Sequence, residues 1–295
     1  MVRILERDQH FHGAIPIGVV PIDDQEEMSL HSHNFWELVI ILAGAGEHET
    51  QHGTWTIRMG DVFVIRPGEA HAYHDTNDLR LVNILFDKEA LGLPIFDMAD
   101  LDGFHALFLV EPGMRRHRGR EPRLKIQGET LHEVEHVAWQ LREVLIHQET
   151  GYQAMAFALL IRLICLVSQA CSNMRQGRES QRLLRLGRIF SHIDRHLATS
   201  ITLADLCRLG HMSESTLLRA FRAAVGMTPI QYVNYRRIQR AAEMLQQTDR
   251  AIETIAEQVG IFDANYFSRL FRRYFKCSPS AYRRQQMEDS ANKAF

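Results

Sequence analysis

One stretch of the sequence occurs twice in the C-terminal part of the chain, at a spacing of fifty residues. Residues 213–232 superpose on residues 263–282. The shared positions are apolar, basic or proline, and they pair Leu217 with Phe267, Arg219 with Arg269, Phe221 with Phe271, Arg222 with Arg272, Pro229 with Pro279 and Tyr232 with Tyr282. Such agreement at one fixed spacing rarely arises by chance, so this part of the chain contains two copies of one structural unit.

Each copy is predicted to be a helix, a short turn and a second helix. In the first copy, Thr202 and Asp205 form a capping box that opens one helix, and Ser213 caps the next. In the second copy, Gly260 supplies the turn and Asp263 the cap. This arrangement is a helix-turn-helix, whose second helix enters the major groove of DNA.

The second helix of each copy has an apolar face and a polar face. The apolar residues recur at helical spacing and should form the core: Leu217, Phe221, Val225, Phe267, Phe271 and Phe275. The polar face supplies the candidate DNA contacts, since Arg can bond guanine and Asn adenine: Ser215, Arg219, Arg222, Asn265, Ser268, Arg269 and Arg272. A merely solvated arginine face is the alternative, which the repetition disfavours.

A helix is predicted between the two copies. Thr228 is its cap, Pro229 occupies its first position, and it should run to about Gln247. Roughly 18 residues at 1.5 Å each give a spacer of about 27 Å. Such a spacer would hold the two second helices near one DNA turn apart.

The charge is distributed unevenly along the chain. Residues 1–175 carry 15 Lys and Arg against 25 Asp and Glu, and residues 176–295 carry 19 against 11, so the net charges are −10 and +8. Only the second part is therefore expected to bind a polyanion. The change of sign falls in the polar stretch 173–180, which we expect to link a domain at 1–175 to a domain at 181–287.

The first domain begins with β-rich runs and ends with helical periodicity. The runs lie at 38–42, 55–57, 62–65 and 79–86, with turn signals at 44–46, 52–53, 60–61, 67–68 and 76–78. Short strands at this spacing predict an antiparallel barrel or sandwich. Residues 111–123, rich in Arg, Pro and Gly, predict an exposed loop. Helical spacing follows at 131–145 and at about 153–174.

The second of these helices is apolar on most faces. It is marginal as a membrane span because Arg162 interrupts it, so we expect the barrel or a partner subunit to cover it. The first ten residues show no secretion signal, and Cys165, Cys171, Cys207 and Cys277 lack disulfide or metal spacing. These features favour a cytoplasmic protein with reduced thiols.

A group of histidines near the first strands resembles the metal-binding motifs of cupin barrels. His31 and His33, at period two, point to the same side of a strand, and Glu37 and His71 could complete a metal site of mixed nitrogen and oxygen ligands. Residues 31–44 resemble the first of the two cupin motifs, and residues 60–71 resemble the second, which has one extra residue before Pro67. The alternative is a polar ligand pocket without metal, so a divalent metal is possible and no cofactor is required.

The repeat region closely resembles the DNA-binding domain of AraC-type regulators, also called the AraC/XylS family. The resemblance covers Thr202 to Arg283 and includes residues 226–229, 255–256, 266–271 and 278–282. It implies base contacts by Ser215, Arg219, Asn265, Ser268 and Arg269. Leu218 departs from the family pattern, because a polar residue is expected there. Readout by the first copy could then be weaker, or could use a thymine methyl group.

The stretch from His31 to Leu91 also resembles the sensor domain of L-rhamnose operon regulators. The resemblance implies a sugar effector bound by His31, His33, Glu37, His71 and Tyr73, with Trp36 and Trp55 as possible stacking surfaces. It further implies a homodimer that pairs through the helices beside the barrel, an operator in double-stranded DNA, and RNA polymerase as a further partner.

The sequence therefore predicts an α+β protein. An antiparallel, cupin-like β-barrel with accessory helices should precede an all-α domain of two helix-turn-helix units joined by a linker helix. The predicted function is a transcription regulator that responds to a small molecule and has no enzymatic activity, and the resemblance implies an activator. A metal-dependent cupin isomerase or oxygenase fused to a DNA-binding domain is the alternative, and a purely architectural DNA binder would not need the sensor pocket.

Overall fold

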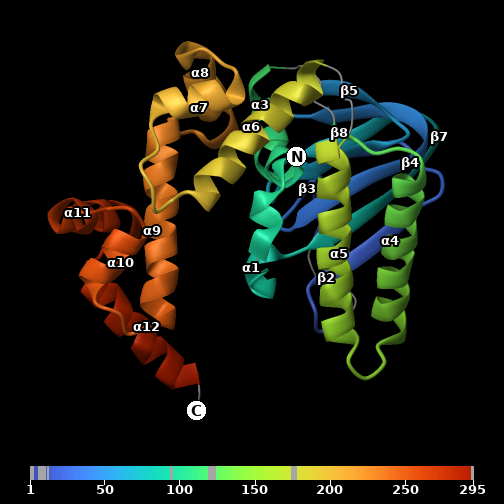
Figure 1. Ribbon diagram of the computed structural model, residues 1–295. Helices are drawn as coiled ribbons and strands as arrows, with labels where there is room; N and C mark the ends of the chain where they lie inside the picture. Colours follow the sequence, from blue (N-terminus) through green and yellow to red (C-terminus); the bar gives the residue numbers. More distant parts are fainter. Residues whose placement is uncertain are drawn as a thin grey trace. The chain divides into compact units, whose positions relative to one another are not determined.

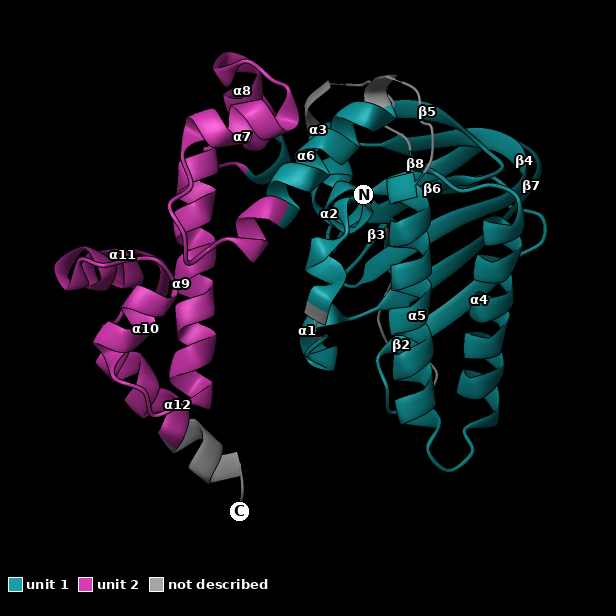
Figure 2. Cartoon of the chain, viewed as in Figure 1, with its two compact units in different colours: residues 1–191, 223–225 teal, residues 192–222, 226–295 magenta. Residues whose placement is uncertain are grey.

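The chain folds into two compact units, one with a β-sheet and one built of helices. The computed structural model describes residues 3–5, 11, 13–93, 96–118, 124–173 and 178–293. The first unit comprises residues 1–191 with 223–225, and the second comprises residues 192–222 with 226–295 (Figure 2). The predicted fold class, an antiparallel sheet domain followed by a helical domain, is confirmed.

The first unit contains one eight-stranded sheet with the order β1-β3-β7-β4-β6-β8, in which β2 also pairs with β7 and β5 with β4. All pairs are antiparallel except β1 with β3, which is parallel. The strands are β1 (Arg3–Leu5), β2 (Ile17–Ile22), β3 (Met28–His33), β4 (Trp36–Thr50), β5 (Gly53–Arg58), β6 (Asp61–Ile65), β7 (His71–Phe86) and β8 (Leu124–Lys125).

Two of the predicted turns are wrong, because they lie inside the long strands β4 and β7. Residues 44–46 and 76–78 face each other there, and the register of the pair shifts at this point. Gly44 has φ +70°, and a Cβ on it would lie 2.0 Å from the carbonyl oxygen of Asp78. Glycine is therefore required by the close approach of the two strands, and the turn signals mark β-bulges.

The helices of the first unit follow β7 in the chain, and the short β8 lies between α3 and α4. They are α1 (Lys88–Leu91), η2 (Phe96–Asp100), α2 (Asp102–His105), the π-helical turn η3 (Ala106–Val110), α3 (Glu111–Arg118), α4 (Glu129–His147) and α5 (Tyr152–Asn173). The two predicted long helices are confirmed as α4 and α5, which lie side by side and antiparallel, with α4 against β2 and β7 (Figure 1). Helix α6 (Arg178–Arg195) crosses the boundary between the units. Residues 174–177 of the predicted linker lie outside the described residues.

Helix α5 is the one helix among the described residues that is long and apolar enough to cross a membrane. The mean hydropathy of its most apolar window is 2.0, and 39% of that window is buried inside the chain. Length and composition alone are weak indications, since core helices pass the same test.

The predicted exposed loop at 111–123 is also wrong. Helix α3 occupies 111–118, and Glu111 and Arg115 are only 2% and 3% exposed; residues 119–123 lie outside the described part. Arg115 Nη2 donates to the carbonyl of Val64 and, at 3.1 Å, to Glu111 Oε2, while its Nε lies 3.9 Å from the buried Glu69 Oε1. Charges that pair inside the protein can be buried, and composition alone does not reveal this.

The second unit contains the two predicted helix-turn-helix copies. Its helices are α7 (Leu203–Gly210), α8 (Glu214–Val225), α9 (Pro229–Gln247), α10 (Ile252–Gln258), α11 (Ala264–Phe275) and α12 (Pro279–Lys293). The expected caps are confirmed: Thr202 and Asp205 form a capping box, Ser213 and Asp263 accept backbone N–H groups three residues on, and Thr228 precedes Pro229 in the first turn of α9. Phe267 and Phe271 are buried with Ile255 and Ala256 in one core.

Glu111 makes the stability of the first unit depend on pH. Burial raises the pKa of its carboxyl to about 7, against the opposing effect of Arg115. The folded protein then holds a proton between about pH 4.5 and 7 that the unfolded chain has released, so the free energy of unfolding falls as pH rises through this range. The predicted loss between pH 5 and 8 is about 2 kcal/mol, from 1.4 kcal/mol per pKa unit.

Urea unfolding of the wild type and of Glu111→Gln at several pH values measures this effect. The amide cannot ionise, so the stability of the wild type relative to the variant should fall between pH 5 and 8. Parallel curves for the two proteins would refute the assignment.

Candidate functional site

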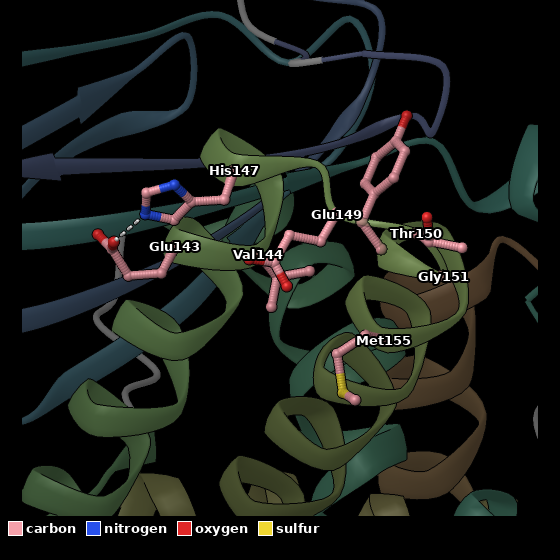
Figure 3. A pocket seen from close by; sticks show the side chains of 8 residues that line it. Glu143, Val144, His147, Glu149, Thr150, Gly151 and Met155 are labelled. Atoms are coloured by element: carbon pink, nitrogen blue, oxygen red, sulfur yellow. Dashed lines mark hydrogen bonds and ion pairs between the residues drawn. The ribbon is translucent and has the colours of Figure 1, made fainter.

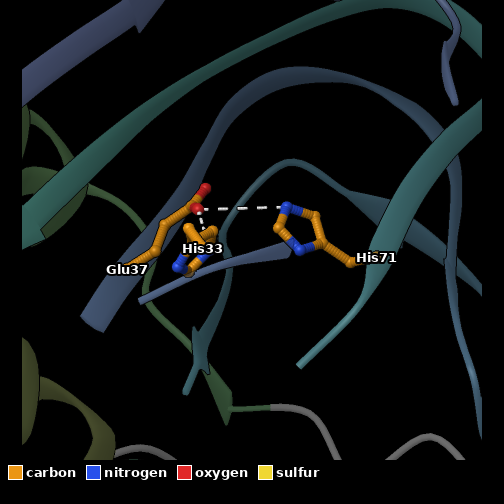
Figure 4. A group of neighbouring side chains, drawn as sticks. All are labelled: His33, Glu37 and His71. Carbon is orange, nitrogen blue, oxygen red and sulfur yellow. Dashed lines mark ion pairs between the residues drawn. The ribbon is translucent and has the colours of Figure 1, made fainter. Parts of the chain in front are cut away.

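Three of the predicted site residues meet inside the sheet of the first unit. His33 ends β3, Glu37 lies at the start of β4 and His71 begins β7, and their side chains point toward one another (Figure 4). All three are buried, and one potential ligand atom from each lies within 4.8 Å of the others. His33 Nε2 is 2.8 Å from Glu37 Oε2, and His71 Nε2 is 3.9 Å from the same oxygen.

The hydrogen bonds of His33 determine where its proton lies. Its Nδ1 is 2.8 Å from the carbonyl oxygen of Phe35, which can only accept, so Nδ1 carries a proton. The other ring nitrogen faces a carboxylate oxygen of Glu37, and this contact needs a further proton or a cation between the two atoms. Metal-binding histidines commonly donate their second N–H to a backbone carbonyl in this way.

His31 and Tyr73 lie beside this trio. The ring of His31 is 4.0 Å from that of His71, and its Nδ1 is 3.0 Å from the carbonyl oxygen of Ser29. Its nitrogens do not belong to the close group of ligand atoms. Tyr73 is 1% exposed, and its hydroxyl has no hydrogen-bond partner among the described residues. The structure thus brings all five predicted residues together, with three of them in the closest contact.

Sequence analysis missed a fourth histidine. His48, 2% exposed, lies with its ring 5.6 Å from that of His71 and 5.3 Å from that of Tyr73. Odd-numbered residues of β4 such as Glu37 face the cluster before the bulge at Gly44, and the even-numbered His48 does so after it. A bulge inserts one residue and reverses the alternation, so a strict period of two assigns His48 to the wrong face.

Burial favours the uncharged forms of His71 and Tyr73. Burial lowers the pKa of His71 well below its ordinary value, and the neighbouring His31, His48 and His33 lower it further. Burial and the carboxylate of Glu37 raise the pKa of Tyr73. At neutral pH the imidazole of His71 is therefore uncharged and can accept a hydrogen bond or bind a metal, and Tyr73 is a phenol that can donate.

The donor set of the trio fits a divalent transition metal. Two imidazole nitrogens and one carboxylate oxygen are ligands that zinc and related metals accept. Two surface cavities, of about 330 and 280 Å³, lie at opposite ends of the α4–α5 hairpin (Figure 3 shows the first, with Glu143 and Met155 in its wall). Neither is lined by residues of the histidine cluster.

The turn before His71 is held by hydrogen bonds to backbone carbonyl groups. The N–H of Gly68 donates to the carbonyl of His33 at 2.7 Å, and Arg66 Nη2 donates to the carbonyl of Leu109 at 2.6 Å. Together with the pairing of Glu69 and Arg115, these contacts tie the histidine cluster to η3 and α3. Of the two predicted stacking surfaces, Trp55 lies near His48, whereas Trp36 packs against Phe86.

The candidate DNA contacts lie on the outer faces of α8 and α11. Ser215, Arg219 and Arg222 of α8 are exposed, as are Asn265, Arg269 and Arg272 of α11, and Ser268 is half-buried. The guanidinium of Arg269 lies over the ring of Tyr266 at 6.0 Å. The unusual Leu218 is half-buried, between the core and the polar face.

Known proteins are similar to both units. Residues 17–164 match the family model of an AraC-like ligand binding domain, and residues 206–285 match that of a helix-turn-helix domain. The HTH-type transcriptional activator RhaR of Mannheimia succiniciproducens is 30% identical over 91% of either chain. RhaR of Klebsiella pneumoniae is 30% identical over 96% of this chain and 97% of its own. RhaS of an Enterobacter species is 29% identical over 90% and 91%.

These matches span both units and nearly the whole length of the relatives, and they agree with the histidine cluster and the paired helix-turn-helix copies. The chain therefore belongs to the AraC family of helix-turn-helix transcriptional regulators, with an AraC-type ligand-binding domain ahead of its DNA-binding domain.

Proposed function

We propose that this protein activates transcription in the cytoplasm in response to a small sugar such as L-rhamnose. The observation that carries the proposal is the joint presence of a buried polar cluster in the first unit and two exposed basic helix faces in the second. Relatives named RhaR and RhaS transcriptional activators support it. RNA polymerase is the further partner that an activator requires.

The second unit is proposed to bind operator DNA through α8 and α11. Both present arginines at the positions that the repeat shares, Arg219 with Arg269 and Arg222 with Arg272. Residues near the helix N-termini would contact bases, and those farther along would contact phosphates. The operator is then a double-stranded site with two half-sites on one face of the duplex.

The first unit is proposed to bind the effector at His31, His33, Glu37, His71 and Tyr73, with His48 added by the structure. A sugar needs several donors and acceptors that exclude water, and these side chains offer imidazoles, a carboxylate and a phenol in a buried place. Effector binding would replace the contacts that the cluster now makes with itself. This replacement would shift the turn at Gly68 that η3 and α3 hold.

A divalent metal is proposed as a second possible occupant of the same cluster. His33, Glu37 and His71 would hold it, since their ligand atoms lie closest together. A bound metal would supply a Lewis-acid centre able to take a sugar hydroxyl as a further ligand. We propose a sensing role for the cluster rather than enzymatic turnover, because the relatives that span both units are named transcriptional activators.

Helices α4 and α5 are proposed to pair two copies of the chain. On α5, Met155 is 54% exposed and Leu159 and Leu166 are half-buried, and Ile146 of α4 is 47% exposed. A helix with this hydropathy is costly to leave in water. A second copy of the same hairpin would cover these side chains.

The DNA contacts can be tested one arginine at a time. Arg269→Ala should cost about 1–3 kcal/mol at the cognate site and relax base preference at one position. Arg272→Ala should weaken binding to all sequences and lower the salt slope by about 1. Mobility-shift titrations at several salt concentrations measure both. Arg240, exposed on α9 and paired with Glu243, is the matched control, and Arg240→Ala should bind as the wild type does.

The effector site is tested by replacing histidines of the cluster, with a histidine outside the cluster as the control. Because a lost buried hydrogen bond costs about 1–3 kcal/mol, His71→Ala should abolish the response to L-rhamnose and leave basal DNA binding intact. His74→Ala is the control, since His74 is partly exposed and pairs with Glu49 away from the cluster. Calorimetry with L-rhamnose and metal analysis of each protein measure the outcome. Equal sugar binding by the wild type and a His31→Ala/His71→Ala protein would place the pocket elsewhere.

The dimer is tested by a charge on the exposed face of α5. Met155→Glu should convert a dimer into a monomer at micromolar concentration, because it puts a carboxylate in an apolar interface. Met287→Glu, at a methionine 56% exposed on α12, should leave the dimer intact. Light scattering of the full chain gives the mass, and a monomeric wild type would contradict the proposal.

A further inference from the structure

Phe262 is the most exposed large apolar side chain among the described residues, at 81%. It directly precedes Asp263, the N-cap of α11. The backbone on either side is fixed, since the N–H of Ile261 donates to Ala256 at 2.9 Å and the N–H of Tyr266 donates to Asp263 Oδ1 at 2.9 Å. Ile261 itself is 4% exposed. The turn thus buries one apolar residue and holds the next one in solvent at a defined place.

The usual structural role of an apolar residue at this position does not apply to Phe262. A residue before the N-cap often packs on the fourth residue of the helix, here Phe267. Phe267 is 1% exposed within the core, and a ring that is 81% exposed does not cover it. In the first copy, the corresponding Met212 before the cap Ser213 is half-buried. The fold therefore gives no reason for an aromatic ring at position 262.

Phe262 lies at the end of the polar face that is proposed to contact DNA. Asn265, Arg269 and Arg272 share one face of α11 by helical spacing, and Phe262 lies two residues before the first residue of this helix. All four residues are exposed. The N-terminal end of a recognition helix is the end that approaches base edges most closely. The ring is therefore exposed at the end of α11 that would lie nearest the base edges.

The apolar character of the Phe262 ring limits which groups of a DNA base it can contact favourably. Phenylalanine has no hydrogen-bonding group, and the C5-methyl of thymine is the apolar group that base edges offer in the major groove. We propose that Phe262 is a specificity-determining residue that contacts a thymine methyl in the half-site bound by α11. This inference rests on the proposed DNA binding and adds to it the identity of one base.

The test uses the full chain and chemically altered DNA. Sites are first selected from random duplexes by the wild type and by Phe262→Ala. The wild type should require thymine at one position of the α11 half-site, and the variant should lose that preference alone. Replacing this thymine by deoxyuridine removes only the methyl group. This replacement should lower the affinity of the wild type for the site about fourfold, the factor expected for one buried methyl group. The affinity of Phe262→Ala should not change.

Ile230→Ala is the matched control, because it also removes an exposed apolar side chain, 39% exposed, and Ile230 belongs to α9 rather than to a recognition helix. It should keep the thymine preference and its sensitivity to deoxyuridine. Three results would overturn the inference. The wild type could ignore the missing methyl, Phe262→Ala could lose affinity equally for all sequences, or it could bind DNA normally and activate less, which would indicate a protein partner. A wild type that selects no duplex at all would refute the proposed function as well.

Discussion

The cost of burying ionisable side chains is the physical constraint on which the first unit depends. An isolated charge in a protein interior loses several kcal/mol of solvation, so such groups persist only in contact with one another. Here they form two neighbouring sets. One consists of His33, Glu37 and His71, and the other consists of Glu69, Glu111 and Arg115. The turn from Arg66 to His71 belongs to both sets. Under the proposed function, an effector bound at the first set would therefore also displace residues of the second.

The second unit follows a different rule, the repetition of a small apolar core. Phe267 and Phe271 of α11 occupy the positions that Leu217 and Phe221 occupy in α8. All four side chains are buried, on the apolar faces of the two helices. Caps at Ser213 and Asp263 begin the two helices at matching points. Because the core and caps fix the rotation of each helix, the polar face is left to vary. This division explains how Leu218 and Phe262 can depart from a polar pattern without damage to the fold.

Local signals in the sequence predicted the helical unit almost completely. Caps and helical spacing depend on neighbours a few residues apart, and the internal repeat is visible when the sequence is superposed on itself; each of these was confirmed. The sheet was harder to predict because its errors come from contacts distant in sequence. The bulge at Gly44, opposite Asp78, reverses the alternation of β4, which is why His48 was missed. Glu111 and Arg115 of α3 are buried beside Glu69, which lies 46 positions before Arg115 in the sequence. His31 and His33 were predicted to share one side because period two holds within β3, and the resemblance to cupin motifs placed Glu37 and His71 with them.

The central claim is that occupancy of the histidine cluster governs the DNA affinity of a separate unit. Coupling of this kind must be reciprocal, so the most direct measurement is the affinity of the full chain for L-rhamnose with and without saturating operator DNA. The account predicts that DNA changes the sugar affinity by about 5- to 150-fold, the range usual for coupled sites, and that the sugar changes DNA affinity by the same factor. If L-rhamnose binds with the same affinity in the presence and absence of operator DNA, the account is contradicted.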